Sequence, residues 1–225
     1  MNTKVKDQFN MLSTDYDSRR SLLIPCFDNL YVSGIEMLAY ADAAPRVLDV
    51  GAGTGIYAEA LLARYPKAML TLIDFAENML ELAKEKFYSR ADVKYILDDY
   101  FTHDYRDAAF DIVISALSIH HLDDSDKQKF YANLYSILDD GGELLNADII
   151  STGAPEIDAR YDEIWTSFVA GNIGEGEYFE RFKASKKVDN PSSYSEQLKW
   201  LRDAGFKQTD CVFKHNNFAV LYARK

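Results

Sequence analysis

Short apolar runs alternate with segments of helical periodicity through the middle of the chain. Five runs predict buried strands: RVLDV (46–50), AMLTLID (68–74), VKYIL (93–97), FDIVISA (110–116) and ELLNADII (143–150). The segments between them predict helices over 55–65, 77–87 and 124–142, the last closed by a pair of glycines. Buried strands that alternate with helices are typical of a parallel sheet covered on both faces.

The two ends of the chain depart from this alternation. Residues 22–41 carry apolar side chains at helical spacing, and Pro25 stands early enough to begin that helix rather than break it. We predict an α/β fold with a doubly wound, mostly parallel sheet and an antiparallel C-terminal hairpin whose turn is at 215–217. The parts of this single predicted domain (1–225) are an N-terminal helical arm (1–44), a core (45–150), an inserted helical cap (155–204) and the hairpin (205–225).

Composition narrows the range of partners. The net charge is −11 and the basic residues are scattered, which disfavours nucleic acid and favours a small-molecule substrate. No apolar run approaches the roughly 18 residues of a membrane span. The polar, acid-containing start predicts neither a secretory signal nor a transit peptide, so we expect a cytoplasmic protein with no membrane partner. Cys26 and Cys211 stand in unlike contexts and predict packed thiols rather than a disulfide.

The first predicted strand ends in a glycine-rich turn, VGAGTGIY. Gly51, Gly53 and Gly55 let the backbone turn tightly and approach a ligand, and the amides that begin the next helix would face that ligand. A P-loop requires a lysine and a Ser or Thr after its last glycine, where Ile56 and Tyr57 stand. The dinucleotide fingerprint would place its third glycine at the position of Ile56, so the turn matches neither pattern.

Two acidic residues beside this turn indicate the kind of ligand. Asp49 lies two residues ahead of the first glycine, where it would repel a pyrophosphate but suit a ligand with an ammonium and a sulfonium group. Asp74 ends the second predicted strand and is placed to accept hydrogen bonds from ribose hydroxyls, a role that nicotinamide enzymes also use. Because ligands of open parallel sheets bind beyond the carboxyl ends of the strands, we expect an adenosine ligand there.

Five runs in register carry a family resemblance: VLDVGAGTG, LIDFAENML, ILDDY, FDIVISALSIHHL and ILDDGGELLNAD. In order and spacing they resemble the class I S-adenosyl-L-methionine (SAM)-dependent methyltransferases, over residues 45–150. The flanking segments are similar to a bacterial and archaeal subgroup that methylates small molecules, and the layout more distantly resembles the carboxy-SAM synthases. The resemblance implies a Rossmann-like fold, SAM as cofactor, S-adenosyl-L-homocysteine as product and methyl transfer to a small molecule.

The resemblance also implies a set of cofactor contacts. It places the methionine part of SAM against Asp49, Gly51, Ala52 and Gly53, the ribose on Asp74, and the adenine against Phe75 and Met79. It assigns the adenine amino group to Asp98 or, by slight preference, Asp99, with Tyr100 beside it. The floor below the sulfonium is implied to be Ser115, Ala116 and Ser118. Taken alone, Phe75 and Met79 at helical spacing are equally typical of a plain core.

His120 and His121, in the run SIHHLDD, are the candidates for the chemistry. Methyl transfer by direct displacement requires alignment, exclusion of water and, in some reactions, removal of a proton, which an imidazole can accept. The alternative is that His120 packs beneath the cofactor and His121 orders the loop. We expect no metal site here, because it would need further ligands.

The arm and the cap supply further candidates. Tyr16, Arg19 and Arg20 precede the helix that is expected to close over the pocket. Tyr16 and Arg20 are candidates for the cofactor and Arg19 for the substrate, since arginine binds carboxylates and other anions; the alternative is helix capping and surface ion pairs. Candidate pocket walls in the cap are Tyr178, Arg181 and Tyr194.

Three functions fit these expectations. The first is a small-molecule methyltransferase whose cap is built from 1–35 and 155–200. The second is a carboxy-SAM synthase-like enzyme, which would need Arg181 or Arg20 to hold an added carboxylate. The third is a non-catalytic SAM-binding protein. An NAD-dependent oxidoreductase is opposed by Ile56 and Asp49. The sequence leaves the acceptor atom open and permits a homodimer through the cap helices.

Overall fold

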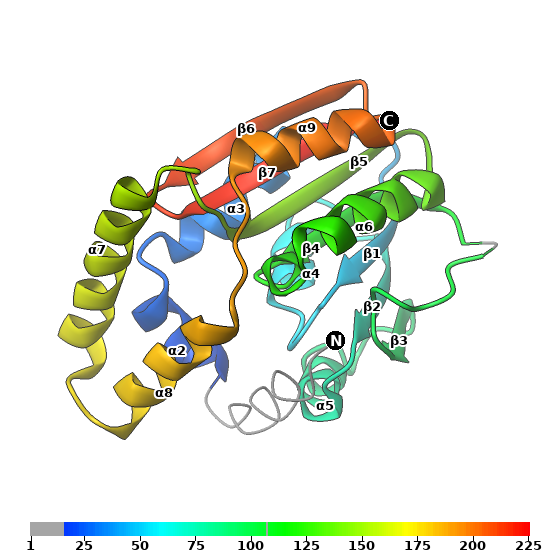
Figure 1. Cartoon of the computed structure of the whole chain (residues 1–225). Helices are drawn as coiled ribbons and strands as arrows, with labels where there is room; N and C mark the ends of the chain where they lie inside the picture. The colour runs from blue at the N-terminus through cyan, green and yellow to red at the C-terminus, as the bar shows by residue number, and fades with distance from the viewer. Residues whose placement is uncertain (1–15, 107) are drawn as a thin grey trace.

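The computed structural model describes residues 16–106 and 108–225, apart from the side chains of Tyr16 and Ser18. A seven-stranded sheet forms its centre (Figure 1). The strands are β1 (Arg46–Val50), β2 (Met69–Asp74), β3 (Val93–Leu97), β4 (Phe110–Ala116), β5 (Leu138–Ile149), β6 (Gln208–His215) and β7 (Phe218–Arg224). Their order is β3-β2-β1-β4-β5-β7-β6; β1 to β5 run parallel, and β7 is antiparallel to β5 and to β6. The predicted doubly wound sheet with its antiparallel C-terminal hairpin is confirmed.

Helices cover both faces of this sheet. The α-helices are α2 (Tyr16–Leu23), α3 (Phe27–Met37), α4 (Ile56–Leu62), α5 (Glu77–Lys86), α6 (Asp124–Ile137), α7 (Pro155–Ile173), α8 (Glu177–Ser185) and α9 (Tyr194–Ala204), and the short 3-10 helices are η2 (Ile119–His121) and η3 (Lys186–Val188). One core lies between the sheet and α3, α4 and α5, and a second lies between the sheet and α6 and α9. The alternation along a strand serves both cores: in β1, Val47 packs in the first core and Leu48 in the second.

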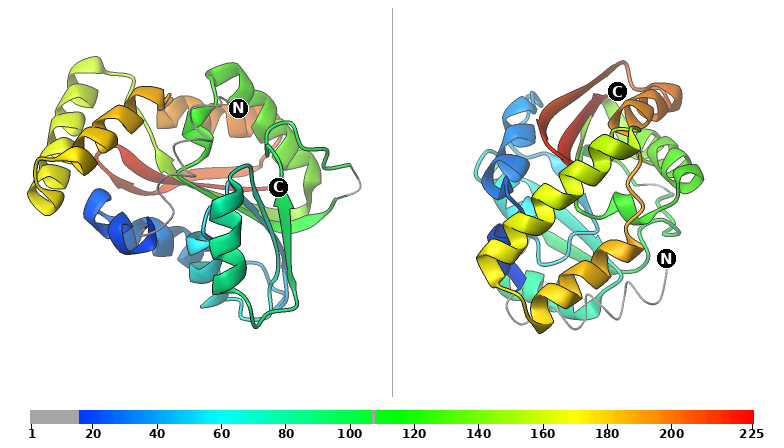
Figure 2. Two further views of the ribbon diagram at one scale, coloured as in Figure 1. Left: turned by 90° about the horizontal axis from the view of Figure 1, so that it is seen from below. Right: turned by 60° about the vertical axis from the view of Figure 1, so that its left-hand side comes forward.

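The remaining helices gather at one end of the sheet. There α7 packs against α2 and α8, on the left in Figure 1, and the right-hand view of Figure 2 brings α7 and α8 forward. The indole N–H of Trp165 in α7 donates to the carbonyl of Leu23 at the end of α2, over 2.6 Å. The arm and the cap are therefore tied to each other. Within the described residues, no helix is long and apolar enough to cross a membrane.

The arm differs from its prediction, because Pro25 separates two helices instead of beginning one. Helix α2 ends at Leu23 and α3 begins at Phe27, with Pro25 in the turn between them. Proline lacks an amide hydrogen and disfavours the helical conformation of the residue before it. As a result, Arg19 and Arg20 lie within a helix rather than ahead of one.

The helix predicted over 124–142 is also shorter than expected. Helix α6 ends at Ile137, and β5 begins directly at Leu138, whose backbone is extended and whose side chain is buried. Leu138 pairs with Phe110, and the register then shifts until Glu143 pairs with Ile112. The glycine pair thus lies in an irregular stretch of the strand, where Gly141 takes a φ of 80°, and does not close the helix.

Candidate functional site

A cleft opens at the carboxyl ends of β1, β2 and β4 and encloses about 560 Å³, part of it open to solvent. Eleven of the predicted site residues line it: Arg20, Asp49, Gly51, Ala52, Gly53, Asp74, Phe75, Met79, Ala116, Ser118 and His121. Its other lining residues were missed by sequence reasoning: Tyr31, Thr54, Ile56, Tyr57 and Leu117. Three of these, Thr54, Ile56 and Tyr57, adjoin the glycine turn, so their positions in the sequence could have identified them as lining residues. Leu117 likewise lies between the predicted floor residues Ala116 and Ser118, whereas nothing in the sequence marks Tyr31.

The glycine turn forms one wall of the cleft. Gly51 and Gly53 have φ values of 64° and 54°, a conformation that favours glycine. A Cβ on Gly51 would lie 2.0 Å from the hydroxyl oxygen of Ser118, so these two backbone segments can approach only because a side chain is missing. In front of Gly53, by contrast, there is no described atom within 4 Å of such a Cβ. The turn therefore presents open space at Gly53 and a tight contact at Gly51.

Asp49 is buried at the back of the cleft with an exposed fraction of 1%. Among the described residues neither of its carboxylate oxygens has a well-formed hydrogen bond, although the Ala58 amide lies close enough to lower its pKa somewhat. Burial and then the nearby Asp74 outweigh that effect and raise the pKa of Asp49 to about 8. A buried carboxylate with so little hydrogen bonding is stabilised by a cationic ligand in the cleft.

Asp74 lies at the end of β2 and joins the two walls of the cleft. Its carboxylate accepts hydrogen bonds from the amides of Gly53 and Ala76, each over 2.8 Å. Burial raises its pKa to about 6, and these amides offset part of the shift. The side chain is thus fixed in direction, with the glycine turn held at a set distance from β2.

Four predicted cofactor contacts do not line the cleft. Tyr100 is fully buried beneath the turn, where its hydroxyl donates to the carbonyl of Ser118 over 2.9 Å. The hydroxyl of Ser115 donates to the carbonyl of Val50 over 2.9 Å. Beyond β3, Asp98 binds His103 at 2.8 Å, and Asp99 accepts from the amide of Phe101. Tyr100 and Ser115 therefore support the turn from behind, since their polar atoms already bond to backbone carbonyls.

The arm and cap candidates fall into two groups. Arg20 reaches the cleft beside Tyr31, whose pKa is raised by burial and partly lowered again by this guanidinium. The guanidinium of Arg19 lies over the ring of Tyr178, 4.8 Å from its centre, which brings the arm and the cap together. The other group lies off the cleft lining and comprises Arg19, Tyr178, Arg181 and Tyr194. Arg181 pairs with the exposed Glu177, and Tyr194 begins α9. The side chain of Tyr16 lies outside the described residues.

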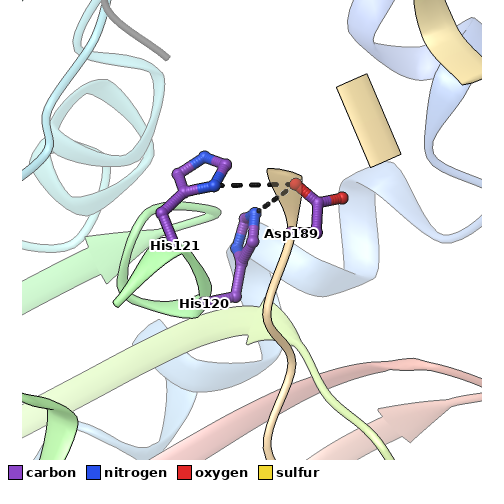
Figure 3. Close-up of side chains that lie close together, drawn as sticks. All are labelled: His120, His121 and Asp189. Atoms are coloured by element: carbon purple, nitrogen blue, oxygen red, sulfur yellow. Dashed lines mark ion pairs between the residues drawn. The ribbon is translucent and has the colours of Figure 1, made fainter. Parts of the chain in front are cut away.

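The two histidines form a cluster with two carboxylates at η2 (Figure 3). His120 Nδ1 lies 2.5 Å from Asp148 Oδ1 on β5, and the His120 amide donates to Asp148 Oδ2. On its other side, His120 Nε2 lies 3.4 Å from Asp189 Oδ1, which is also 3.6 Å from His121 Nδ1. Asp189 directly follows η3, within the cap. The cluster thus joins the core to the cap.

The surroundings shift the pKa values of the two imidazoles in opposite directions. Burial disfavours the charged form of His120, but Asp148 and then Asp189 outweigh burial and raise its pKa to about 10. Burial and then the neighbouring His120 lower the pKa of His121 to about 3. His120 does not line the cleft and is 4% exposed, whereas the neutral ring of His121 does line it. Sequence reasoning missed both acids, although an acid inside the apolar run LLNADII was a signal for Asp148.

Comparisons with known proteins agree with this geometry. Residues 47–142 match the profile of a family described as "Methyltransferase domain". Malonyl-[acyl-carrier protein] O-methyltransferase 1 of Ilyobacter polytropus is 32% identical over 75% of this chain and 72% of its own length. The carboxy-S-adenosyl-L-methionine synthase of Campylobacter hominis is 25% identical over 99% of this chain and 97% of its own. An O-methyltransferase family protein from Burkholderia thailandensis shares the fold, with a TM-score of 0.67 at 18% identity over all of this chain, which spans 60% of that structure.

Proposed function

Because the chain belongs to the class I SAM-dependent methyltransferases, we propose that it methylates a small-molecule acceptor held between the cleft and the cap. The cofactor of this family is SAM, and its product is S-adenosyl-L-homocysteine. When bound, SAM supplies a methyl group on a positively charged sulfur. The work of the protein is then to hold the cofactor, to position the acceptor in line with that methyl and to exclude water.

Asp49 is the observation that carries this proposal. Its buried carboxylate has little hydrogen bonding and lies in the cleft next to the open space in front of Gly53. The ammonium group of a methionine moiety matches that carboxylate in charge and in hydrogen-bonding capacity. A pyrophosphate offers this carboxyl no positive charge and would be repelled by its ionised form, which is why a nicotinamide dinucleotide does not suit the cleft.

The other cleft residues take the roles that their positions suit. Asp74 would accept from the ribose, Phe75 and Met79 would pack against the adenine, and Arg20 would bind the cofactor carboxylate. Direct contact between Asp99 and the adenine stays a prediction. His121, neutral and on the lining, would face the acceptor.

Native mass spectrometry of the purified protein is the first test, followed by denaturation to identify any small molecule released. Release of SAM or S-adenosyl-L-homocysteine, and a micromolar dissociation constant for either by calorimetry, would support the proposal. An Asp49→Asn variant should lose most of that affinity. A wild-type protein that ignores added SAM would refute the proposal.

A carboxy-SAM synthase-like activity is the second candidate. Its support is the similarity to the Campylobacter hominis enzyme over nearly the whole chain. Such an enzyme would need a cation for the added carboxylate, and Arg20 is placed in the cleft, whereas Arg181 is paired with Glu177 away from the lining. Release of a carboxylated SAM from the purified protein would favour this candidate over methyl transfer.

We also propose a cytoplasmic protein of one domain that binds no nucleic acid. The net charge of −11 supports the last point, and the free thiols of Cys26 and Cys211 suit a reducing compartment. A homodimer through the cap helices is supported by Ile157 and Ile164, which are large apolar residues exposed on α7. Sedimentation velocity over a range of concentrations would test the dimer.

A further inference from the structure

We propose that His120, His121 and Asp189 bind one divalent transition-metal ion beside the cleft (Figure 3). Each residue offers one ligand atom, and these atoms all lie within 4.8 Å of one another. The same carboxylate oxygen of Asp189 lies 3.4 Å from His120 Nε2 and 3.6 Å from His121 Nδ1. Two imidazoles and one carboxylate are a donor set that suits first-row ions such as zinc, cobalt and iron rather than magnesium or calcium. Asp189 is the further ligand that the sequence did not reveal.

Asp148 gives this cluster the outer support that metal-binding histidines have. It lies 2.5 Å from His120 Nδ1 and also accepts a hydrogen bond from the His120 amide. A carboxylate on one ring nitrogen fixes the direction of the imidazole and leaves the other nitrogen for the metal. In Figure 3 that other nitrogen is directed toward Asp189. The histidine is thus held in place before any ion binds.

The charge of the cluster also calls for a cation. The side chains of Asp148 and Asp189 are only 2% and 13% exposed, and the proton that they share with His120 balances one of their two negative charges. Lys127 and Lys186 lie near enough to influence the cluster, but Lys127 donates to Asn190 and Ser192, and Lys186 to Asp162. Buried charges are costly unless they are paired, and a divalent ion that replaces this proton would balance the second negative charge as well.

The cluster lies where a bound ion could contact a ligand in the cleft. His121 belongs both to the cluster and to the lining of the cleft, so the ion would lie where the cleft meets the cap. Three protein ligands leave a coordination position for a further donor atom. An acceptor with a hydroxyl or carboxylate oxygen could take that position and be held next to the cofactor. This use of the ion rests on the proposed function, whereas metal binding itself does not.

Cobalt(II) is the probe for the first experiment, because its visible absorption reports the geometry of its ligands. Untagged protein would be treated with a chelator, desalted and titrated with cobalt(II), with zinc(II) as competitor. We expect about one equivalent of cobalt(II) to bind, and Asp189→Asn and His121→Gln to weaken binding by at least about tenfold. His103→Gln is the matched control, since it removes a histidine from the more exposed Asp98 pair and should bind cobalt(II) as the wild type does.

Two outcomes would overturn the metal site. One is a wild-type protein with no cobalt(II) absorption and no competition by zinc(II), in which case a proton shared by His120 and the two acids holds the cluster together. The other is equal binding by the wild type and by both variants, checked as folded by circular dichroism. Calorimetry with SAM separates the two proposals. Asp189 does not line the cleft, so the Asp189→Asn variant should bind cobalt(II) weakly but bind SAM as the wild type does. A wild type that binds cobalt(II) but not SAM would instead refute only the proposed function.

Discussion

The proposed contact between Asp49 and the cofactor predicts that cofactor binding depends on pH. Burial and the nearby Asp74 raise the pKa of its carboxyl to about 8, so below that pH the unliganded protein holds a proton there. An ammonium group favours the ionised carboxylate, and binding therefore releases the proton. We expect the dissociation constant of SAM to fall as the pH rises from about 6 toward 8, by as much as about tenfold per unit. Calorimetry in buffers of different ionisation enthalpy measures the affinity and the released proton together.

The control for this dependence is Asp49→Asn, which keeps the shape of the side chain and removes its titration. Its weaker affinity for SAM should be flat over the same range, with no proton released. If the variant keeps the pH dependence of the wild type, another group titrates on binding and the role of Asp49 is wrong.

Gly51 and Gly53 form a matched pair in one turn, with similar φ values but different surroundings. Gly51→Ala would place its Cβ 2.0 Å from Ser118 Oγ, so we expect a loss of about 2–4 kcal/mol in the free energy of unfolding. Gly53→Ala meets no described atom within 4 Å, so it should lose only about 1–2 kcal/mol to backbone strain, yet bind SAM at least about tenfold more weakly. Urea unfolding and calorimetry measure the two effects. A Gly53→Ala protein with wild-type affinity would mean that the cofactor does not approach this glycine.

At the scale of elements, buried strands were the most predictable feature of the chain. The runs at 46–50, 93–97 and 110–116 match β1, β3 and β4 residue for residue. The strands β1 and β4 are buried on both sides and read as continuous apolar segments, whereas β3 is the partly exposed edge strand. Helix ends were harder to predict. Glycines close many helices, but here the burial of Leu138 and its pairing with Phe110 ended α6 earlier.

The site was predictable where it follows strand ends and not where distant segments meet. Asp49 and Asp74 were found because the carboxyl ends of parallel strands share one edge. Asp189 was not, since it follows a short 3-10 helix in a segment without periodicity and reaches the histidines only through tertiary packing. Likewise, only the packing shows that Tyr100 and Ser115 face carbonyls behind the turn.

Two helical glycines test whether packing outweighs helix propensity. Alanine is favoured over glycine inside a helix by about 1 kcal/mol. In α3, however, a Cβ on Gly34 would lie 2.7 Å from Val220 Cγ1 of β7, so Gly34→Ala should destabilise the protein by about 1–3 kcal/mol. In α7, Gly171 has no described atom within 4 Å, and Gly171→Ala should stabilise by about 0.5–1 kcal/mol. Chemical unfolding of both variants measures whether each substitution raises or lowers the free energy of unfolding. A more stable Gly34→Ala protein would mean that α3 can move away from the sheet.

At the scale of the whole molecule, the segment after η3 ties the cap to the cleft. The Asn190 amide donates to the carbonyl of His120, and the buried ammonium of Lys127 donates to the carbonyl of Asn190 and, over 2.6 Å, to the hydroxyl of Ser192. At the other end of the cap, Trp165 binds the carbonyl of Leu23 in the arm that carries Arg20. A ligand in the cleft contacts Arg20 and His121, and both of their segments are bonded to the cap, so its binding should stabilise the molecule as a unit.

Thermal unfolding measures that stabilisation. A ligand that binds only the folded state adds about 2.7 kcal/mol when present at about 100 times its dissociation constant. For a chain of 225 residues this corresponds to a rise in Tm of about 5–10 °C, which we expect from both SAM and S-adenosyl-L-homocysteine in scanning calorimetry. NAD at the same concentration should leave Tm unchanged, because its pyrophosphate offers no positive charge to Asp49, and Asp49→Asn should reduce the shift produced by SAM. Equal shifts with NAD and SAM would show that the cleft recognises only adenosine and that the acid ahead of the glycine turn does not select the ligand.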